Sequence, residues 1–259
     1  MGNGRRYGSS MAGETSAPRR ARPSGRVWLV LVCALTVIVF LAVVTPAAFD
    51  VRHEERSREI TRPIKRLVLD SKGTVKLEIK PSRDGHVHLL RSSDVSRDSR
   101  LVERVKVSGT TLTIDSSCTG SRLGVLRRCN LHYHLRLPRK TALALRLHFG
   151  AITLKGIQGR LDLKLDAGKF DGFGCNKRAD VSLRFGGIDY RDSCVPKYFR
   201  ARMSIGDIAL RVPAGRYNVH VEHRAKRPFA NIIEDPSSPD EIDAEVSLGG
   251  SIAITGARR

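Results

Sequence analysis

The sequence predicts an all-β protein: a parallel β-solenoid, similar to a β-helix, made of short coils with a glycine at each corner, behind one N-terminal transmembrane helix. Three observations predict it. Residues 27–44 contain no charge. From about residue 64, apolar and polar residues alternate as in half-buried strands. From about residue 141, a strand–glycine–strand pattern recurs every 18–20 residues, a period typical of stacked repeats.

The N-terminal apolar run has the length of a membrane span. It holds 18 uncharged residues and continues without a charge to Phe49, and a span needs roughly 20 apolar residues. Arginines crowd the chain before it, with Glu14 the only acid, whereas the charges after it are mixed. The positive-inside rule therefore predicts a signal-anchor of a single-pass cell-membrane protein, with a cytoplasmic N-terminus and an extracellular C-terminal domain.

Two alternatives to a permanent, unmodified anchor stay open. Small residues after position 44 would suit signal-peptide cleavage, although the leader and the apolar run are both long for one. Cys33 could carry a lipid, although the apolar run extends well beyond it. The expected organisation is a disordered basic cytoplasmic leader at 1–25, a transmembrane helix at 26–49, a polar stalk at 50–63 and a β-repeat ectodomain at 64–256.

Five segments share alternating apolar residues, a glycine, and an apolar residue two places later. One such unit cannot bury its own apolar face, so the units should stack as coils. Glycine suits the corner because the chain there needs a positive φ or a close backbone approach. Inward residues should then form one ladder before the glycines and another after them. The glycines are Gly150, Gly168, Gly186, Gly206 and Gly250; the first ladder is Leu147, Leu165, Leu183, Met203 and Val246 or its neighbour; the second is Ile152, Phe170, Ile188, Ile208 and Ile252.

The repeat has one irregular interval. Gly206 and Gly250 lie 44 residues apart, close to two periods. We expect this interval to hold one irregular coil, with Tyr217, Val219 and Val221, and a loop over 223–240. A short turn around 96–103 is the only helical candidate beyond the anchor. The alternative fold is an antiparallel sandwich whose turns contain glycine by coincidence.

The units GAITLKGIQGRLDLKLDAGKF and GGIDY, with the strand-rich region before them, resemble the putative-adhesin β-strand-repeat family of bacterial cell-envelope proteins. The resemblance covers roughly 64–256 and is strongest over 141–212. It implies a β-solenoid ectodomain, often behind one N-terminal span. It implies no established activity and supplies no catalytic residue, because the motifs carry packing and not chemistry.

Four cysteines follow the apolar run, where oxidation is permitted. Cys175 and Cys194 are 19 residues apart, which is one coil. Residues one coil apart lie about 4.8 Å apart, within the disulfide Cα range of about 4.4–6.8 Å. The expected pairs are therefore Cys175–Cys194 and, across a local loop, Cys118–Cys129. Free thiols or a metal site are the alternative.

Histidines offer one further candidate metal site. His132 and His134 would share a strand face close to Cys129. However, no CxxC or HExxH spacing supports the site and no acid lies near in sequence. Surface histidines, with no metal and no cofactor, are the expectation.

Enzyme signatures are missing from the sequence. It contains no GxSxG elbow, P-loop or Rossmann fingerprint. Asp162, Asp166 and Asp171 are the best candidates for a carbohydrate-active β-helix enzyme. Lys164 and Lys169 interleave with them, so we expect a salt-bridged face, no catalytic residue and no enzyme.

The charge distribution indicates an anionic partner. The formal net charge is +20, and residues 116–160 contain no Asp or Glu. Such blocks commonly mark interaction surfaces, although a merely soluble basic face is the alternative. Nucleic acid is not expected outside a membrane; anionic lipid and phosphate-bearing wall polymer are. The candidate anion-binding residues are Arg122, Arg127, Arg128, Arg136, Arg139 and Lys140.

Together these expectations describe a membrane-anchored cell-envelope protein whose adhesin-like ectodomain serves binding or scaffolding toward anionic envelope components. One alternative is an envelope-stress or signalling accessory protein that docks a membrane-protein partner. A more remote alternative is a carbohydrate-active enzyme, which would require clustered carboxylates on one face of the solenoid.

Overall fold

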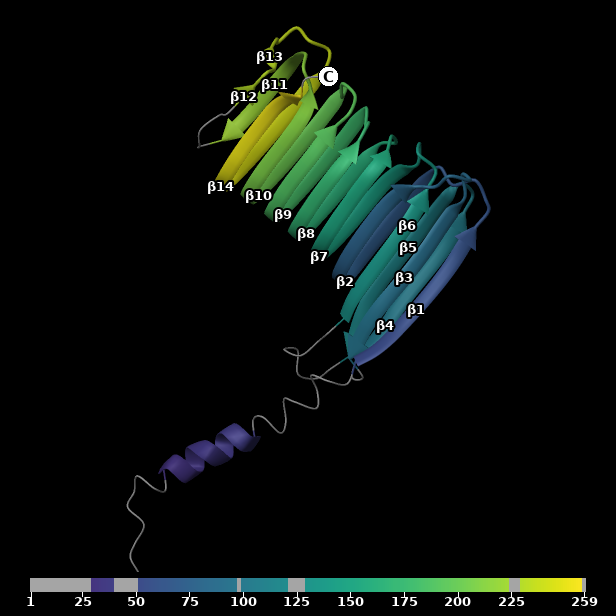
Figure 1. The fold of residues 1–259 in the computed structure, drawn as a ribbon, viewed down its shortest axis with the longest axis vertical. Helices are drawn as coiled ribbons and strands as arrows, with labels where there is room; N and C mark the ends of the chain where they lie inside the picture. Colours follow the sequence, from purple (N-terminus) through teal and green to yellow (C-terminus); the bar gives the residue numbers. More distant parts are fainter. Residues whose placement is uncertain (1–28, 40–50, 97–98, 121–128, 224–228, 258–259) are drawn as a thin grey trace, which may run out of the picture. The chain divides into compact units, whose positions relative to one another are not determined.

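The computed structural model describes residues 29–39, 51–96, 99–120, 129–223 and 229–257 (Figure 1). The chain divides into two compact units, Met1–Pro46 and Ala47–Arg259. In the first unit a helix covers 29–39, and all of its described side chains are exposed. Over the described ranges we find no helix whose length and apolar character would let it cross a membrane. The expected leader at 1–25, and the expected span before residue 29 and after residue 39, lie outside the described residues.

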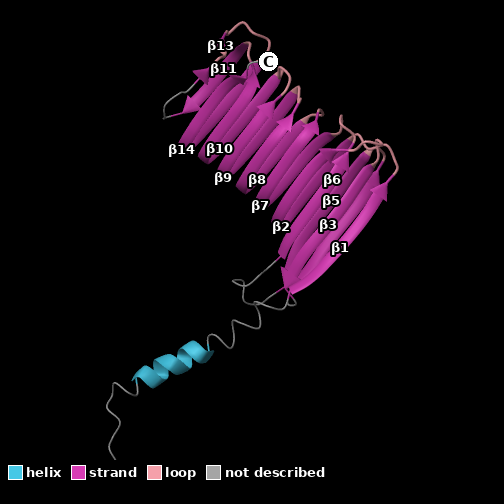
Figure 2. Cartoon of the chain, viewed as in Figure 1, coloured by secondary structure: helices cyan, strands magenta, loops and turns pink. Residues whose placement is uncertain are grey.

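The described part of the second unit consists of strands joined by turns (Figure 2). The strands are β1 (Val51–Ile60), β2 (Arg66–Pro81), β3 (Val87–Ser96), β4 (Ser99–Ser108), β5 (Thr111–Gly120), β6 (Cys129–Leu137), β7 (Ala142–Ile157), β8 (Leu161–Gly174), β9 (Arg178–Asp192), β10 (Tyr198–Pro213), β11 (Arg216–His223), β12 (Phe229–Ala230), β13 (Ile233–Glu234) and β14 (Glu241–Ala257). They form one large sheet that is mostly parallel, in the order β1-β3-β6-β2-β7-β8-β9-β10-β14-β11-β13. The predicted all-β class is confirmed.

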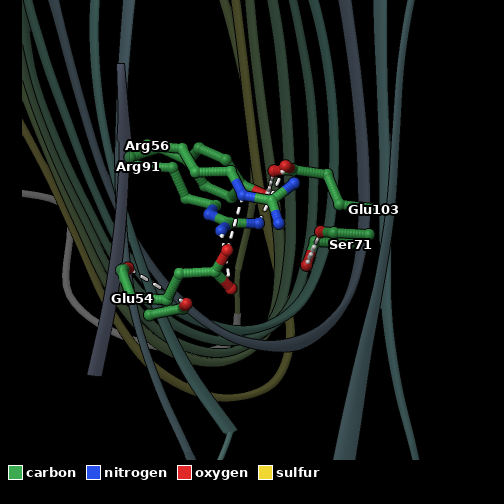
Figure 3. A network of polar contacts seen from close by, with 8 residues as sticks. Glu54, Arg56, Ser71, Arg91 and Glu103 are labelled. Carbon is green, nitrogen blue, oxygen red and sulfur yellow. Dashed lines mark hydrogen bonds and ion pairs between the residues drawn. The ribbon is translucent and has the colours of Figure 1, made fainter. Parts of the chain in front are cut away.

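The long strands wind back on themselves. Only three residues separate the end of β7 from the start of β8, and the two strands are parallel neighbours. A straight strand of 16 residues would end about 50 Å from its start, far beyond the reach of three residues. Each strand must therefore bend between two halves, and the ribbons curve in this way when seen along the stack (Figure 3). Parallel pairing of β7, β8, β9, β10 and β14 contradicts the antiparallel-sandwich alternative.

The bends fall at the predicted glycines. Gly168 pairs with Gly150 on one side and with Gly186 on the other. The five corner glycines have φ between 135° and 147°. A Cβ on Gly168 would also overlap the carbonyl oxygen of Gly150, and the same overlap recurs at each later corner. Both expected reasons for glycine, a positive φ and a close backbone approach, therefore apply at every corner.

Both predicted apolar ladders are confirmed. Leu147, Leu165 and Leu183 pair in succession, and Val246 itself, not its neighbour, continues the ladder from Met203. The second ladder runs from Ile152 through Phe170 to Ile252 in the same way. All ten side chains are at most 4% exposed. Burial of each stabilises the fold by about 1.5–3 kcal/mol.

The C-terminal strand corrects one expectation. The interval between Gly206 and Gly250 holds the expected irregular coil, but this coil does not lie between the two glycines, because β14 pairs directly with β10 and places them side by side. Strand β11 lies beyond β14 and pairs with its first half, and β12 pairs with its second half. Together β11 and β12 take the place of one coil that has no corner glycine. They cover the end of the stack, as terminal capping units do.

The N-terminal region corrects two further expectations from the sequence. The expected polar stalk contributes strand β1, which pairs antiparallel with β3 at the edge of the sheet. Its side chains from Arg52 to Glu59 are exposed, so it lacks the alternating apolar pattern by which a strand is predicted. The expected turn near 96–103 holds the end of β3 and the start of β4. Strands β5 and β6 lie parallel to the first and second halves of β2, and so take the place of one coil.

A buried polar network fills the N-terminal end of the core (Figure 3). Arg91 on β3 is 2% exposed. Its guanidinium donates a hydrogen bond to Glu103 at 2.9 Å and forms an ion pair with Glu54 at 3.2 Å. The Tyr133 hydroxyl donates to the other carboxylate oxygen of Glu103 at 2.7 Å, and burial raises the pKa of this phenol. The capping strands are therefore joined by charge as well as by apolar contact.

Candidate functional site: a basic ladder

One row of outward-facing side chains crosses six neighbouring strands and carries five cations. We call it the basic ladder: Arg136, Lys80, Lys155, Phe173, Arg191 and Arg211, on β6, β2, β7, β8, β9 and β10. The strand registers align Arg136 with Lys80, and Lys155 through Phe173 and Arg191 to Arg211. Pairing of Ile79 with Leu154 brings Lys80 beside Lys155. Successive positions lie about 4.8 Å apart.

Strand alternation explains why the ladder faces solvent. Each cation of the ladder follows a buried residue of its own strand, and successive strand residues point to opposite faces. Ile79 precedes Lys80, and Leu154 precedes Lys155; both are fully buried. The core residues of the second strand halves therefore fix the direction of the cations.

A hollow of about 440 Å³ lies at one end of the basic ladder. Its lining residues are Lys80, Pro81, Arg83, Arg136 and Lys155, and none of them is acidic. Two further hollows adjoin it: one of about 390 Å³ shares Lys80 and Arg136, and one of about 230 Å³ shares Lys155. We call the first the basic hollow.

The charges of the ladder are only partly compensated. Lys80 pairs with Glu78 at 2.6 Å, and Arg211 pairs with Asp189 at 3.4 Å. The hydrogen bond from Lys80, followed by that of His134, lowers the pKa of the Glu78 carboxyl. Over the described ranges, the other cations of the ladder and hollow form no ion pair: Arg83, Arg136, Lys155 and Arg191. Like charges at strand spacing repel, and a bound anion would relieve that repulsion.

The predicted anion-binding residues are only partly brought together. Arg136 belongs to the ladder and lines the basic hollow. Arg139 and Lys140 are exposed on the turn after β6; the carbonyl oxygen of Arg139 accepts the amide of Gln158 at 2.7 Å. Neither lines the hollow. The remaining three candidates lie outside the described residues: Arg122, Arg127 and Arg128.

Most residues of the basic ladder were not among the predicted anion-binding residues, although the sequence contains one signal for them. Lys155, Phe173 and Arg191 are spaced by 18 residues, and Arg211 follows after 20, the spacing of the corner glycines. The glycine period therefore identifies this row directly. Lys80 and Arg83 carry no such signal, because β2 lies outside the recurring segments.

The histidine pair is confirmed as a surface feature, with one correction. His134 pairs with Glu78 at 2.9 Å, so an acidic partner is near in space although it is far in sequence. Cys129 is joined to Cys118 and offers no thiolate. The described residues contain two groups of metal-type side chains: Cys175, Asp192 and Cys194, of which the cysteines are joined, and the surface group Glu59, Asp84 and His86.

The candidate carboxylates do not form one cluster. Asp162 and Asp166 precede the corner at Gly168 and Asp171 follows it, so they belong to different halves of the coil. Asp171 pairs with Lys169 at 2.9 Å, and this hydrogen bond raises the pKa of the lysine. The expected salt-bridged face is present at that position.

Both expected disulfides are confirmed. Cys175–Cys194 has a Cα–Cα distance of 5.1 Å and Cys118–Cys129 one of 6.4 Å. The first joins successive coils, where the amide of Ser193 donates to the carbonyl of Gly174 at 2.7 Å. The second spans the interval between β5 and β6. Cys33 is free and exposed.

Comparisons with known proteins agree with the resemblance seen in the sequence. No family model and no curated protein matches the chain. Similar solved structures include a putative cell adhesion protein from Clostridium sporogenes, with a TM-score of 0.43 and 14% identity over 80% of this chain and 100% of the other. A putative adhesin from Bacteroides fragilis has a TM-score of 0.31 and 10% identity over 78% and 97%. A putative lipid binding protein from Parabacteroides distasonis has a TM-score of 0.22 and 13% identity over 79% and 96%. At such scores the likeness carries no argument about function.

Proposed function

We propose that this chain is a membrane-anchored binding protein of the cell envelope, whose solenoid ectodomain holds an anionic component along the basic ladder. The basic hollow is the observation that carries the proposal. It gathers four cations without one lining carboxylate. A structural role would favour compensation of these charges, as occurs for Arg91 in the core. Lys80 is paired with Glu78, but in the described residues Arg83, Arg136 and Lys155 form no ion pair and suit a ligand that brings its own negative oxygens.

Phosphate is the chemistry that fits these cations best. Arginine binds phosphate oxygens through paired N–H groups, and lysine adds a compact charge. The ladder has six positions and spans roughly 24 Å at strand spacing. A linear chain of phosphates would contact several positions at once, whereas a single phosphate would occupy only the hollow. Phosphodiester wall polymers and phospholipid headgroups share this chemistry.

The anchor is the second part of the proposal. The uncharged run over 27–44 and the arginines before it support one span with a cytoplasmic N-terminus. The two disulfides of the β unit suit the oxidising side of a membrane. Protease added to intact cells should remove a C-terminal tag, and protection of that tag would contradict this orientation.

Ligand binding can be tested on the full chain in detergent micelles. The probes are a linear polyphosphate and, separately, phosphatidylglycerol mixed into the micelles. Replacing Arg136, Lys155 and Arg191 by Ser should weaken polyphosphate binding at least about tenfold, since charge-assisted hydrogen bonds contribute about 1.5–3 kcal/mol each. The control variant replaces Arg100, Arg104 and Lys106 on β4 by Ser, which removes the same charge away from the ladder.

The two probes and two variants give distinct outcomes. Weakened polyphosphate binding in the ladder variant alone supports a polymer ligand. Weakened binding of phosphatidylglycerol alone assigns the ladder to headgroups. Equal losses in both variants would mean that net charge, and not the ladder, attracts the anion.

A further inference from the structure

A row of exposed apolar side chains runs alongside the glycine corners, on a different side of the coils from the basic ladder. We call it the apolar ridge: Phe149, Phe185, Ile205 and Leu248, which are 55%, 46%, 44% and 74% exposed. Phe149, Ala167, Phe185 and Ile205 pair in succession from β7 to β10. Leu248 adjoins Gly249, the residue of β14 that pairs with Ile205. Strand register therefore assembles the ridge.

The ridge exists because alternation slips at the corner. His148 and Phe149 are both exposed although they are consecutive, and so are Arg184 and Phe185. An apolar residue that strict alternation would bury thus faces solvent on the outer side of the bend. Such a contiguous exposed apolar row marks an interaction surface. All of it lies within paired strands, so burial in an apolar medium would leave little backbone unpaired.

The start of the β unit lies on the same side of the coils as the apolar ridge. The strand registers continue the row of Phe149 through β2, β6 and β3 to His53, only two residues from Val51, where β1 begins. Six residues, 45–50, separate Val51 from the end of the uncharged run. Such a segment spans at most about 22 Å. A membrane that held the run would therefore be close to this side.

Cations flank the ridge on the first strand halves. Arg146 pairs in register with Lys164, and Arg202 lies two strands further along the same row. All three are exposed, and across the part of the chain that the structure describes none of them forms an ion pair. They would meet anionic headgroups when the ridge enters a bilayer surface.

We propose that the apolar ridge docks onto the anionic bilayer that holds the chain's own anchor, with its apolar side chains in the interfacial layer and Arg146, Lys164 and Arg202 against the headgroups. This inference rests on the anchor of the proposed function but not on the basic ladder. A second copy of the chain fits the ridge less well, because ridge-to-ridge contact would bring two rows of unpaired cations together. Docking would fix the orientation of the β unit and leave the basic ladder on another side.

Tryptophan quenching tests the docking on the full chain. The chain has one tryptophan, so Trp28→Phe provides a silent background for Phe185→Trp on the ridge. Ile233→Trp is the control, because Ile233 is 59% exposed and lies on β13, outside both the ridge and the basic ladder. In vesicles that contain phosphatidylglycerol and brominated lipid, quenching at position 185 should exceed that at 233 at least about threefold, as for side chains inserted at an interface.

A charge variant completes the test. Replacing Arg146, Lys164 and Arg202 by Ser should reduce quenching at position 185, as should purely zwitterionic lipid. Equal quenching at both positions, or none at 185 in a chain that floats with the vesicles, would overturn the docking. The docking would also be overturned if the tryptophan emission at position 185 shifted with the density of protein on the vesicles and not with the lipid, because a second copy would then cover the ridge. A chain that does not float with vesicles contradicts the anchor, and the docking with it, but leaves polyphosphate binding as a separate result.

Discussion

The repeat strands β7–β10 and β14 differ from the capping strands β1 and β3–β6 in what determines their pairing. In the repeat, each coil has its own corner glycine and two apolar ladder residues, so the residues that fix its register all lie within the coil. In the cap, β3 pairs antiparallel with β1 and β6, which are distant in sequence, and its Arg91 binds partners on β1 and β4. Strand pairing in the repeat thus depends on the close backbone approach that the corner glycines allow, whereas strand pairing in the cap depends on a buried network of charged side chains.

The largest expected effect tests the repeat. Gly168→Ala should destabilise the chain by more than about 4 kcal/mol, because its Cβ overlaps the carbonyl oxygen of Gly150 at a φ of 144°. Gly249→Ala is the control, since a Cβ there meets nothing within 4 Å. Denaturant unfolding should separate the two variants clearly. A small effect at Gly168 would mean that the corners do not fix the coils.

This contrast also shows what the sequence could and could not predict. Corner glycines and ladders were predictable because each unit repeats the same local requirement. Strand β1 was not, because its polar residues lack the apolar alternation that marks the other strands, and its ion pair with Arg91 joins residues far apart in sequence. The position of β14 between β10 and β11 was not predictable either, since it depends on which strand is long enough to pair with both halves of β10. Within the ladder, Arg191 and Arg211 follow the repeat period, but Lys80 depends on the pairing of β2 with β6.

The second effect tests the cap. Arg91→Met should cost about 3–5 kcal/mol, because Glu103, with a side chain only 11% exposed, would lose its cation. Hydrogen exchange should then show the cap opening before β7–β10. The companion variant replaces Arg91, Glu103 and Tyr133 by Met, Leu and Phe, and should recover much of the loss. If the single variant opens both regions together, the cap and the repeat are one cooperative unit.

The third effect concerns a buried charge within the repeat. Burial raises the pKa of Asp192 to about 7, so the folded chain retains a proton that the unfolded chain releases. This contribution to stability is fully present below about pH 4 and is lost as the pH rises through about 7, by up to about 4 kcal/mol. Asp192→Asn should remove this pH dependence. Parallel stability–pH curves for both proteins would show that Asp192 titrates normally.

The smallest effect compares the two disulfides. Replacing Cys175 and Cys194 by Ser should cost about 3 kcal/mol by the loop-entropy model. Proteolysis should then increase around 172–198 before the cap is cleaved, because neighbouring coils contribute separate terms to stability. Replacing Cys118 and Cys129 should instead expose the cap first. Cleavage in the same order for both variants would contradict independent regions.

The most direct test of ligand binding is lysine footprinting of the full chain with linear polyphosphate. Acetylation of Lys80 and Lys155 should fall several-fold when the polymer is bound, because both lysines line the basic hollow. Lys106 on β4 is exposed and should react equally with and without polymer. Protection confined to Lys140, or equal protection of all four lysines, would contradict the basic ladder as the binding site.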